Sequence, residues 1–333
     1  MPAAAHLPAV LQERFAVLGD PGYTAERCAS LAQLMDEIDT LKRDRHAVVL
    51  AHNYQRPEIF QVADFVGDSL ELARQATRVD ADVIVFCGVH FMAETAKILN
   101  PSRRVILPDL RAGCSLADSV TAEDLVERKA ALRAVYPDLA VVSYVNTTAE
   151  VKAESDACCT SANAVRVVEA LPSRHILFVP DKNLAAHVQS QTTKSIIAWD
   201  GNCYVHHQIT PEQILAVKQA LPRIAVLAHP ECRQDVLALA DQVLSTSGMV
   251  QYAKASSRTE FLIVTECGLS DRLLLEVPEK RFYKSCKLCA YMKLITLENT
   301  RDALRDLAPE ITIPEDVRVR AARALDAMLT LGG

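Results

Sequence analysis

Three cysteines occupy the same position in a sequence repeat that runs three times along the chain. Three short apolar stretches align with one another at a period of about 88 residues, which is the spacing of a repeated structural unit. They end at His52, Tyr144 and His229, and the residues 59 to 62 positions further on are Cys114, Cys203 and Cys289. Three similar units around a pseudo-threefold axis would bring these thiols to one point.

Three converging thiolates predict a metal centre. They could hold zinc with a fourth ligand, but structural zinc sites usually contain close Cys-x2-Cys pairs, and only Cys286 and Cys289 have that spacing. They could also hold an iron–sulfur cluster, which generally takes four cysteines. Three ligands would leave one iron of a [4Fe–4S] cluster open. Such an iron could act as a Lewis acid that removes a hydroxyl from a substrate, which is dehydration chemistry.

The other cysteines are predicted to be small buried hydrophobic residues, because free cysteine is often buried. This interpretation covers Cys28, Cys87, Cys158, Cys159, Cys232 and Cys267. Cys286 is less simple, since a Cys-x2-Cys pair can be redox-active. Only Cys289 keeps the register of the repeat, so we expect Cys289 to be the ligand and Cys286 to be a redox neighbour. The spacing leaves open whether the two form a disulfide.

Acid–base groups stand at the ends of the three aligned stretches. In open α/β sheets, ligands bind outside the carboxyl ends of the strands. His52, Tyr144 and His229 end the stretches, and Tyr54, Asn146 and Glu231 follow two residues later. Histidine, tyrosine and glutamate are common general acids and bases. A single histidine is more often a packed structural residue, but equivalent placement in three units favours a functional site.

Three hydroxyl residues lie 17 positions after the same three ends. They are Ser69, Ser161 and Thr246, each just before a predicted helix. A hydroxyl at that position commonly caps the helix, and for one residue alone that is the more frequent role. It can also donate to an anion at the positive end of the helix. Three such ends would form a cavity for a dicarboxylate or a phosphate ester.

The elements that position these residues are predicted to be a helix followed by β-α-β-α-β in each unit. In the first unit the predicted strands begin at Ala47, Val83 and Val105. Short apolar strands that alternate with helices indicate parallel sheets covered on both faces. The predicted fold is therefore α/β, with three αβα units around a central active site. Predicted boundaries are 1–113, 114–202 and 203–290, and two helices split around Pro309 and Pro314 occupy 291–333.

Composition restricts the class of protein. The 333 residues are 50% hydrophobic and carry a net charge of −6, with no evident basic face for nucleic acid. No apolar run approaches the roughly 18 residues of a membrane span. The first residues do not have the pattern of a secretory signal. We therefore expect a cytoplasmic protein with reduced thiols.

The motifs in their order resemble quinolinate synthase, the A protein of bacterial NAD biosynthesis. The resemblance extends from Ala51 to about Leu297. It is carried by short motifs at residues 51–54, 66–69, 108–118, 144–147, 160–163, 180–184, 201–203, 229–232 and 245–249. It implies three α/β units around one [4Fe–4S] cluster with three cysteine ligands. It also implies condensation of iminoaspartate with dihydroxyacetone phosphate to give quinolinate, phosphate and water.

The resemblance assigns roles position by position. Cys114, Cys203 and Cys289 match the cluster ligands. Residues that match substrate-binding positions are His52, Ser69, Tyr144, Asn146, Ser161, His229, Glu231 and Thr246, and Tyr54 matches an acid–base tyrosine. Proton transfer is expected from Tyr54, Glu231, Tyr144 and the two histidines. The chain departs from the family pattern at Ala290 and at His207, which leaves the role of His206 open.

The implied partners are small molecules, with functional coupling to an aspartate oxidase or dehydrogenase that supplies the imine. Two other functions are compatible with the residues alone. One is a zinc-dependent lyase acting on a sugar phosphate, which would contain zinc without inorganic sulfide. The other is a non-catalytic iron–sulfur sensor, which would not need acid–base groups at three strand ends.

Overall fold

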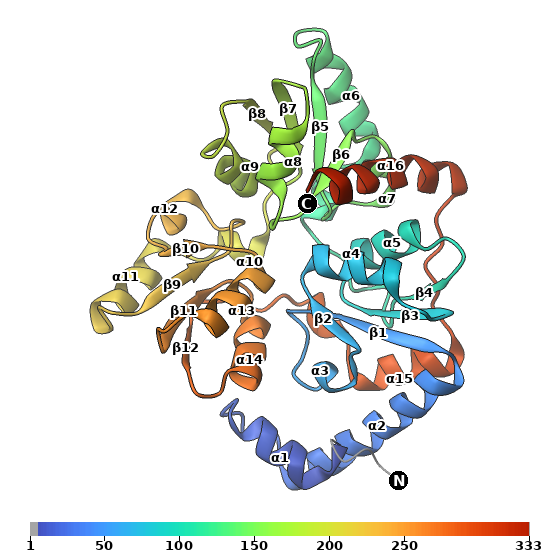
Figure 1. Ribbon diagram of the computed structural model, residues 1–333, viewed down its shortest axis with the longest axis vertical. Helices are drawn as coiled ribbons and strands as arrows, with labels where there is room; N and C mark the ends of the chain where they lie inside the picture. Colours follow the sequence, from blue (N-terminus) through green and yellow to red (C-terminus); the bar gives the residue numbers. More distant parts are fainter. Residues whose placement is uncertain (1–5, 333) are drawn as a thin grey trace.

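The computed structural model describes residues 6–332 and consists of three α/β units arranged around a common centre (Figure 1). Each unit contains one four-stranded parallel sheet, and the strand orders are β2-β1-β3-β4, β6-β5-β7-β8 and β10-β9-β11-β12. The connectivity is thus the same three times, and the predicted α/β class with three αβα units is confirmed. The exact unit boundaries remain a prediction.

The first unit follows two N-terminal helices, α1 (Pro8–Ala16) and α2 (Ala25–Asp44). Its strands are β1 (Ala47–His52), β2 (Phe65–Gly67), β3 (Val83–Cys87) and β4 (Arg104–Ile106). Its helices are α3 (Ile59–Val62), α4 (Ser69–Arg78) and α5 (His90–Leu99). Every residue of β3 is buried, as expected for a central strand that is covered on both faces.

The second unit repeats this order, with α6 before its first strand in the place that α2 has in the first unit. Its strands are β5 (Ala140–Tyr144), β6 (Ala157–Cys159), β7 (His175–Val179) and β8 (Ser195–Ala198). Its helices are η2 (Ala117–Ser119), α6 (Ala122–Arg133), α7 (Ala149–Ala153), α8 (Ala164–Ala170) and α9 (Lys182–Gln189).

The third unit has the same arrangement. Its strands are β9 (Ala225–Ala228), β10 (Gln242–Val243), β11 (Glu260–Val264) and β12 (Arg281–Lys284). Its helices are α10 (Tyr204–His207), α11 (Pro211–Ala220), α12 (Gln234–Leu237), α13 (Thr246–Ala255) and α14 (Cys267–Glu276).

Each sheet has one strand more than the sequence predicts. The additional strands β2, β6 and β10 are edge strands of two or three residues, too short to leave an apolar pattern. An aspartate just before each of these strands makes the same contact. Its carboxylate accepts the backbone N–H of the central strand at 2.7 Å, in the pairs Asp64–Val49, Asp156–Val141 and Asp241–Val226. These aspartates lie in the register of the repeat, 12 residues after His52, Tyr144 and His229.

The chain ends in η3 (Met292–Leu294) and two helices, α15 (Leu297–Asp306) and α16 (Glu315–Leu331), as the two prolines predict. Helix α15 packs on α2 and β3 of the first unit. Helix α16 packs on α7 and β6 of the second unit and on α5 of the first, and therefore holds these two units together (Figure 1). One apolar core runs from the first unit into parts of the second and third.

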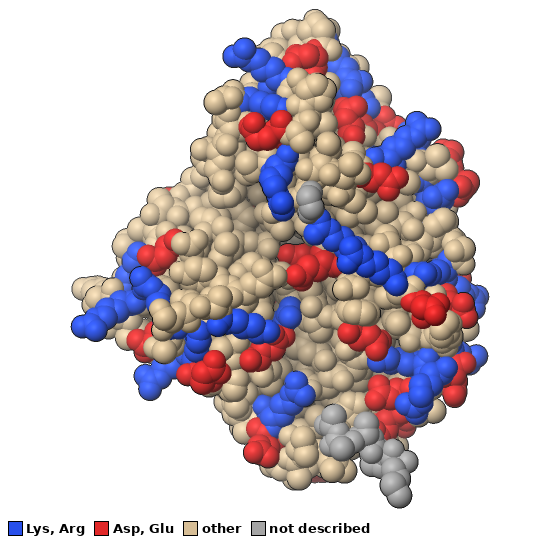
Figure 2. Space-filling model, in the orientation of Figure 1, with Lys and Arg blue, Asp and Glu red and all other residues tan. Residues whose placement is uncertain are grey.

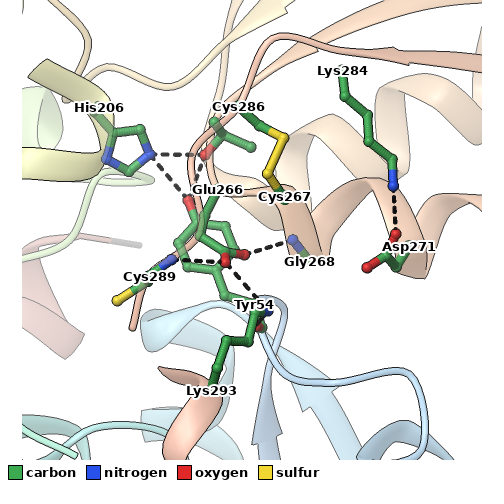
Figure 3. The surroundings of a disulfide bond; sticks show 11 residues. Tyr54, His206, Glu266, Cys267, Gly268, Asp271, Lys284, Cys286, Cys289 and Lys293 are labelled. Carbon is green, nitrogen blue, oxygen red and sulfur yellow. Dashed lines mark hydrogen bonds and ion pairs between the residues drawn. A yellow bond between two sulfur atoms is a disulfide. The ribbon is translucent and has the colours of Figure 1, made fainter. Parts of the chain in front are cut away.

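Cys267 is not a free core cysteine, because it forms a disulfide with Cys286 at an S–S distance of 2.09 Å (Figure 3). The prediction failed because sequence spacing does not show that β11 and β12 are parallel neighbours. Cys267 follows the first of these strands and Cys286 follows the second, so both lie at one sheet edge. Cys286 therefore does not pair with Cys289, which has a free thiol.

On the face drawn in Figure 2, basic and acidic side chains are interspersed, and acidic side chains also lie near its centre. Within residues 6–332, none of the helices combines the length and the apolar character that a membrane crossing requires.

Candidate active site

A cavity with an empty volume of about 630 Å³ lies where the three units meet. All twelve candidate residues from the sequence line it. They are His52, Tyr54, Ser69, Cys114, Tyr144, Asn146, Ser161, Cys203, His229, Glu231, Thr246 and Cys289. These residues lie at the carboxyl ends of β1, β5 and β9 and in the loops and helix starts that follow. Equivalent positions of the repeat therefore share one cavity, as expected.

The three hydroxyl residues do not cap their helices. Asp68 caps α4 and Ser245 caps α13, so Ser69 and Thr246 are the first helical residues and not the caps. Ser161 lies three residues before α8, whose N-cap position is Asn163. With other residues at the caps, these hydroxyls can face the cavity. The Thr246 hydroxyl accepts a hydrogen bond from the buried amide of Asn53 at 2.7 Å.

His52 and His229 are held in one tautomer by the same backbone contact. The N–H of Tyr54 donates to Nδ1 of His52 at 3.2 Å, and the N–H of Glu231 donates to Nδ1 of His229 at 3.4 Å. Burial lowers the pKa of each imidazole to about 3. Both rings are therefore neutral at physiological pH and carry their proton on Nε2, from which they can donate to an anion.

Glu231 lies at the centre of a buried hydrogen-bond network. Its Oε1 accepts the hydroxyl of Tyr144 at 2.5 Å, and its Oε2 lies 2.7 Å from Nδ1 of His206. Burial alone would raise the pKa of Glu231, yet this pKa lies below its ordinary value. The contact with His206 and the hydrogen bonds from His206 and Tyr144 cause the lowering, so the carboxylate is ionised.

The network continues from His206 into the first unit. Nε2 of His206 lies 2.8 Å from the hydroxyl of Thr265, which lies 2.6 Å from the hydroxyl of Tyr54. Burial raises the pKa of Tyr54 and that of Tyr144 well above the ordinary value, so both phenols are protonated. One connected set of proton-holding groups thus spans all three units.

The three thiols share a local geometry. Cys203 is the N-cap of α10, and the other two precede the short helices η2 and η3. Backbone amides two or three residues further on form hydrogen bonds that lower the thiol pKa. These amides belong to Leu116 and Ala117 for Cys114, to His206 for Cys203, and to Tyr291 and Met292 for Cys289.

Burial has a larger effect on the thiol pKa than these amides have. It raises the pKa of all three thiols, that of Cys114 to about 12, and the neighbouring acidic groups add to the shift. Thiols in such a site become thiolates when a cation binds them, because a metal ligand must be deprotonated.

Two further features point to bound ligands. Oδ1 of Asn146 is buried without a hydrogen-bond partner, although such atoms are almost always paired. Ligand atoms of Cys203, His206 and Glu231 all lie within 4.8 Å of one another, close enough to hold a single metal ion. This second set includes one of the three repeated thiols.

Sequence reasoning missed several residues at the site. The sequence pattern assigns no role to His206 and does not identify Thr265, Asp181, Glu266 or Lys293. Asp181 and Glu266 carry a signal that could have found them, because each lies 37 residues after the end of its first strand. Thr265 and Lys293 reach the site only through the packing of the third unit on the first, which the sequence pattern does not show.

The comparisons with known proteins show the family of this chain. The family model for the quinolinate synthetase A protein matches residues 36–330. A quinolinate synthase of Desulforudis audaxviator is 55% identical over 302 residues, covering 90% of this chain and 98% of the relative. A quinolinate synthase of Thermodesulfovibrio yellowstonii is 55% identical over 303 residues, covering 89% and 98%. Quinolinate synthase 1 of Methanosarcina acetivorans is 51% identical over 302 residues, covering 90% and 98%. The chain belongs to the quinolinate synthase A family.

Proposed function

We propose that this protein is a quinolinate synthase that condenses iminoaspartate with dihydroxyacetone phosphate, releasing phosphate and water. The observation that carries the proposal is the shared cavity, in which three repeated thiols meet an ionised Glu231 and two neutral histidines. Family membership supports the same activity. We also propose a cytoplasmic location and coupling to an aspartate oxidase or dehydrogenase that supplies the unstable imine.

The donor set fits a [4Fe–4S] cluster held by Cys114, Cys203 and Cys289. All three sulfurs are free, line one cavity and have nearby backbone N–H groups that stabilise thiolates. Within residues 6–332, no other cysteine lines this cavity. A cluster with three protein ligands supplies a Lewis acid for dehydration when it is bound.

Binding of the two anionic substrates is assigned to neutral donors. Nε2–H of His52 and of His229, together with the hydroxyls of Ser69 and Ser161, can donate to carboxylate and phosphate oxygens. Neutral donors suit this role because they bind an anion without forming a fixed ion pair inside the protein. The unpaired Oδ1 of Asn146 accepts, and we assign it to the N–H of the imine substrate.

Proton transfer is assigned to the network around Glu231. Oε1 of the ionised Glu231 accepts the hydroxyl proton of Tyr144, and this carboxylate can take up a substrate proton while Nδ1–H of His206 keeps it oriented. Thr265 connects His206 to Tyr54, whose protonated phenol can return a proton on the first-unit side. Positioned acid–base groups of this kind commonly contribute about 10²- to 10⁴-fold to a rate.

The direct test is an anaerobic assay for quinolinate, with iminoaspartate generated in place by an aspartate oxidase and with dihydroxyacetone phosphate added. The wild-type chain should form quinolinate. Glu231→Gln should reduce the rate by about 100-fold or more, because an amide cannot take up the proton. Exposed Glu127→Gln on α6 is the matched control. No quinolinate from a wild-type chain with a full cluster would end the proposal.

One observation favours a second candidate. The set of Cys203, His206 and Glu231 has the mixed thiolate, imidazole and carboxylate donors that zinc accepts. It would suit a zinc-dependent lyase acting on a sugar phosphate. Metal analysis after anaerobic purification separates the two, because zinc without inorganic sulfide supports only the lyase.

A further inference from the structure

A backbone contact ties each candidate thiol to the helix that follows the second core strand of its unit. The first N–H of that helix donates to the carbonyl two residues before the cysteine. The pairs are His90 to Ala112 at 2.7 Å, Lys182 to Gly201 at 2.8 Å, and Cys267 to Lys287 at 3.3 Å. We call residues 112–114, 201–203 and 287–289 the thiol loops.

In the second and third units, a buried carboxylate adds a second tie. Oδ2 of Asp181 accepts the backbone N–H of Cys203 at 3.2 Å, and Oε1 of Glu266 accepts that of Cys289 at 3.1 Å. The other oxygen of each carboxylate caps its own helix. Oδ1 of Asp181 accepts the N–H of Leu184 at 2.8 Å, and Oε2 of Glu266 accepts that of Gly268 at 2.6 Å.

This double contact explains why both positions hold an acid. A carboxylate has two acceptor oxygens and no donor, whereas an amide or a hydroxyl could satisfy only one of the two N–H groups without a donor clash. Both side chains are completely buried, so neither is placed there for contact with water. Such burial is costly unless the hydrogen bonds are made.

The residue after each of these two acids is crosslinked through its side chain to the residue three positions before the thiol. In the second unit, Lys182 pairs with Asp200 at 2.8 Å. In the third unit, the disulfide joins Cys267 to Cys286 at the equivalent pair of positions (Figure 3). Cys286 lies three residues before Cys289. Figure 3 shows Glu266 between this disulfide and Lys293, whose Nζ lies 3.2 Å from Oε1 of Glu266.

The first unit has neither the buried acid nor the side-chain crosslink. The position 37 residues after His52 is Val89, which cannot accept a hydrogen bond, and its helix has no side-chain cap. In the crosslink register stand His90 and Arg111, and Arg111 pairs with Asp109 instead. The loop of Cys114 is therefore held to α5 by the backbone contact without a buried acid.

We propose that Asp181 and Glu266 are positioning residues that fix the Cys203 and Cys289 loops for cofactor binding. The inference rests on the proposed function for the identity of the cofactor, but the contacts themselves do not. Each acid holds one thiol loop against its own helix, so the effect of each is confined to one cysteine. The loop of Cys114 depends on neither acid.

The experiment measures amide hydrogen exchange in the full-length chain, in peptides that cover each thiol loop. Asp181→Ala should accelerate exchange at Cys203 by roughly tenfold, the factor that corresponds to the loss of one buried hydrogen bond. Glu266→Ala should do the same at Cys289. Neither variant should change exchange at Cys114.

Matched controls come from the edge-strand aspartates. Asp156→Ala and Asp241→Ala also remove a carboxylate that accepts a buried backbone N–H, in the same two units but away from the thiol loops. They should accelerate exchange at Val141 and Val226 and leave the cysteines unchanged. If an alanine variant does not fold, Asp181→Asn or Glu266→Gln, which keep one acceptor oxygen, should give the same residue-specific pattern more weakly.

A second readout uses the reconstituted holoenzyme. Iron release to a chelator should be roughly tenfold faster from each positioning variant than from its control. Wild-type exchange rates at Cys203 and Cys289 in the alanine variants would overturn the proposal, as would equal acceleration at all three loops. If the wild-type chain holds no cluster, the proposed function fails while the exchange measurement still decides the role of the two acids.

Discussion

At the scale of single residues, the site depends on which groups are charged. His52 and His229 are neutral because they are buried and because their Nδ1 atoms accept backbone N–H groups. Glu231 is ionised although it is buried, since His206 and Tyr144 form hydrogen bonds to it. Neutral donors for anions thus stand beside one ionised base. The repeat register predicted where these residues lie, but their protonation depends on contacts between units.

The neutral histidines predict a pH-dependent stability. The pKa of His52 is about 3 in the folded chain and 6.5 ordinarily, so the unfolded chain binds more protons between these values. Its contribution to stability is complete above pH 6.5 and is lost as the pH falls toward 3, by up to about 1.4 kcal/mol per pH unit.

His52→Gln should therefore make the free energy of unfolding in urea depend less steeply on pH, by about this amount per unit between about pH 4.5 and 6. His90→Gln, at an imidazole that is 42% exposed, is the control. An unchanged slope in His52→Gln would contradict the neutral assignment of this ring.

At the scale of elements, the three sheets share contacts that no apolar pattern reveals. The aspartates that fix the edge strands repeat in register and in distance. The sequence predicted nine of the twelve strands because short apolar runs that alternate with helical segments mark them. The strands that it did not predict are two or three residues long. They are held in place by side-chain acceptors and by pairing with one neighbouring strand.

The edge-strand aspartates predict similar stability losses in different units. Asp156→Ala and Asp241→Ala should each lower the free energy of unfolding by about 0.5–1.5 kcal/mol, because a backbone N–H loses a partly solvent-exposed acceptor. Asp156→Asn, which keeps an acceptor oxygen, should lose less. Denaturant unfolding measures all three, and an alanine variant as stable as wild type would show that the contact contributes nothing.

Contacts between elements also limited the prediction of the site. Cys267 and Cys286 are 19 residues apart and meet only because β11 and β12 are parallel neighbours. Glu266 and Asp181 reach their cysteines across the same kind of sheet edge. The thiols themselves could be predicted, because they keep one register through all three units, whereas their supporting residues differ from unit to unit.

At the scale of the whole molecule, the C-terminal helix α16 lies outside the repeat and joins the first unit to the second. Its buried face includes Leu325 and Met328, which belong to the core shared by the first and second units. A helix outside the repeat therefore stabilises the junction of the first and second units.

Leu325→Ala should lower the free energy of unfolding by about 2–5 kcal/mol, because it leaves a cavity in a fully buried contact. Val319→Ala on the same helix, where the side chain is 38% exposed, should change it by less than about 0.5 kcal/mol. Thermal or urea unfolding measures both. Equal effects of the two substitutions would mean that α16 does not stabilise the junction of the units.

The central claim is that three repeated thiols hold one iron–sulfur cluster at the meeting point of the units. Its most direct test is the iron and acid-labile sulfide content of anaerobically reconstituted Cys114→Ala, Cys203→Ala and Cys289→Ala chains. Wild type should contain about four of each per chain. The control Cys159→Ala, at a buried residue outside the cavity lining, should match it. Each of the three variants should lose most of its iron and its quinolinate formation. A variant that keeps both in full would contradict the claim.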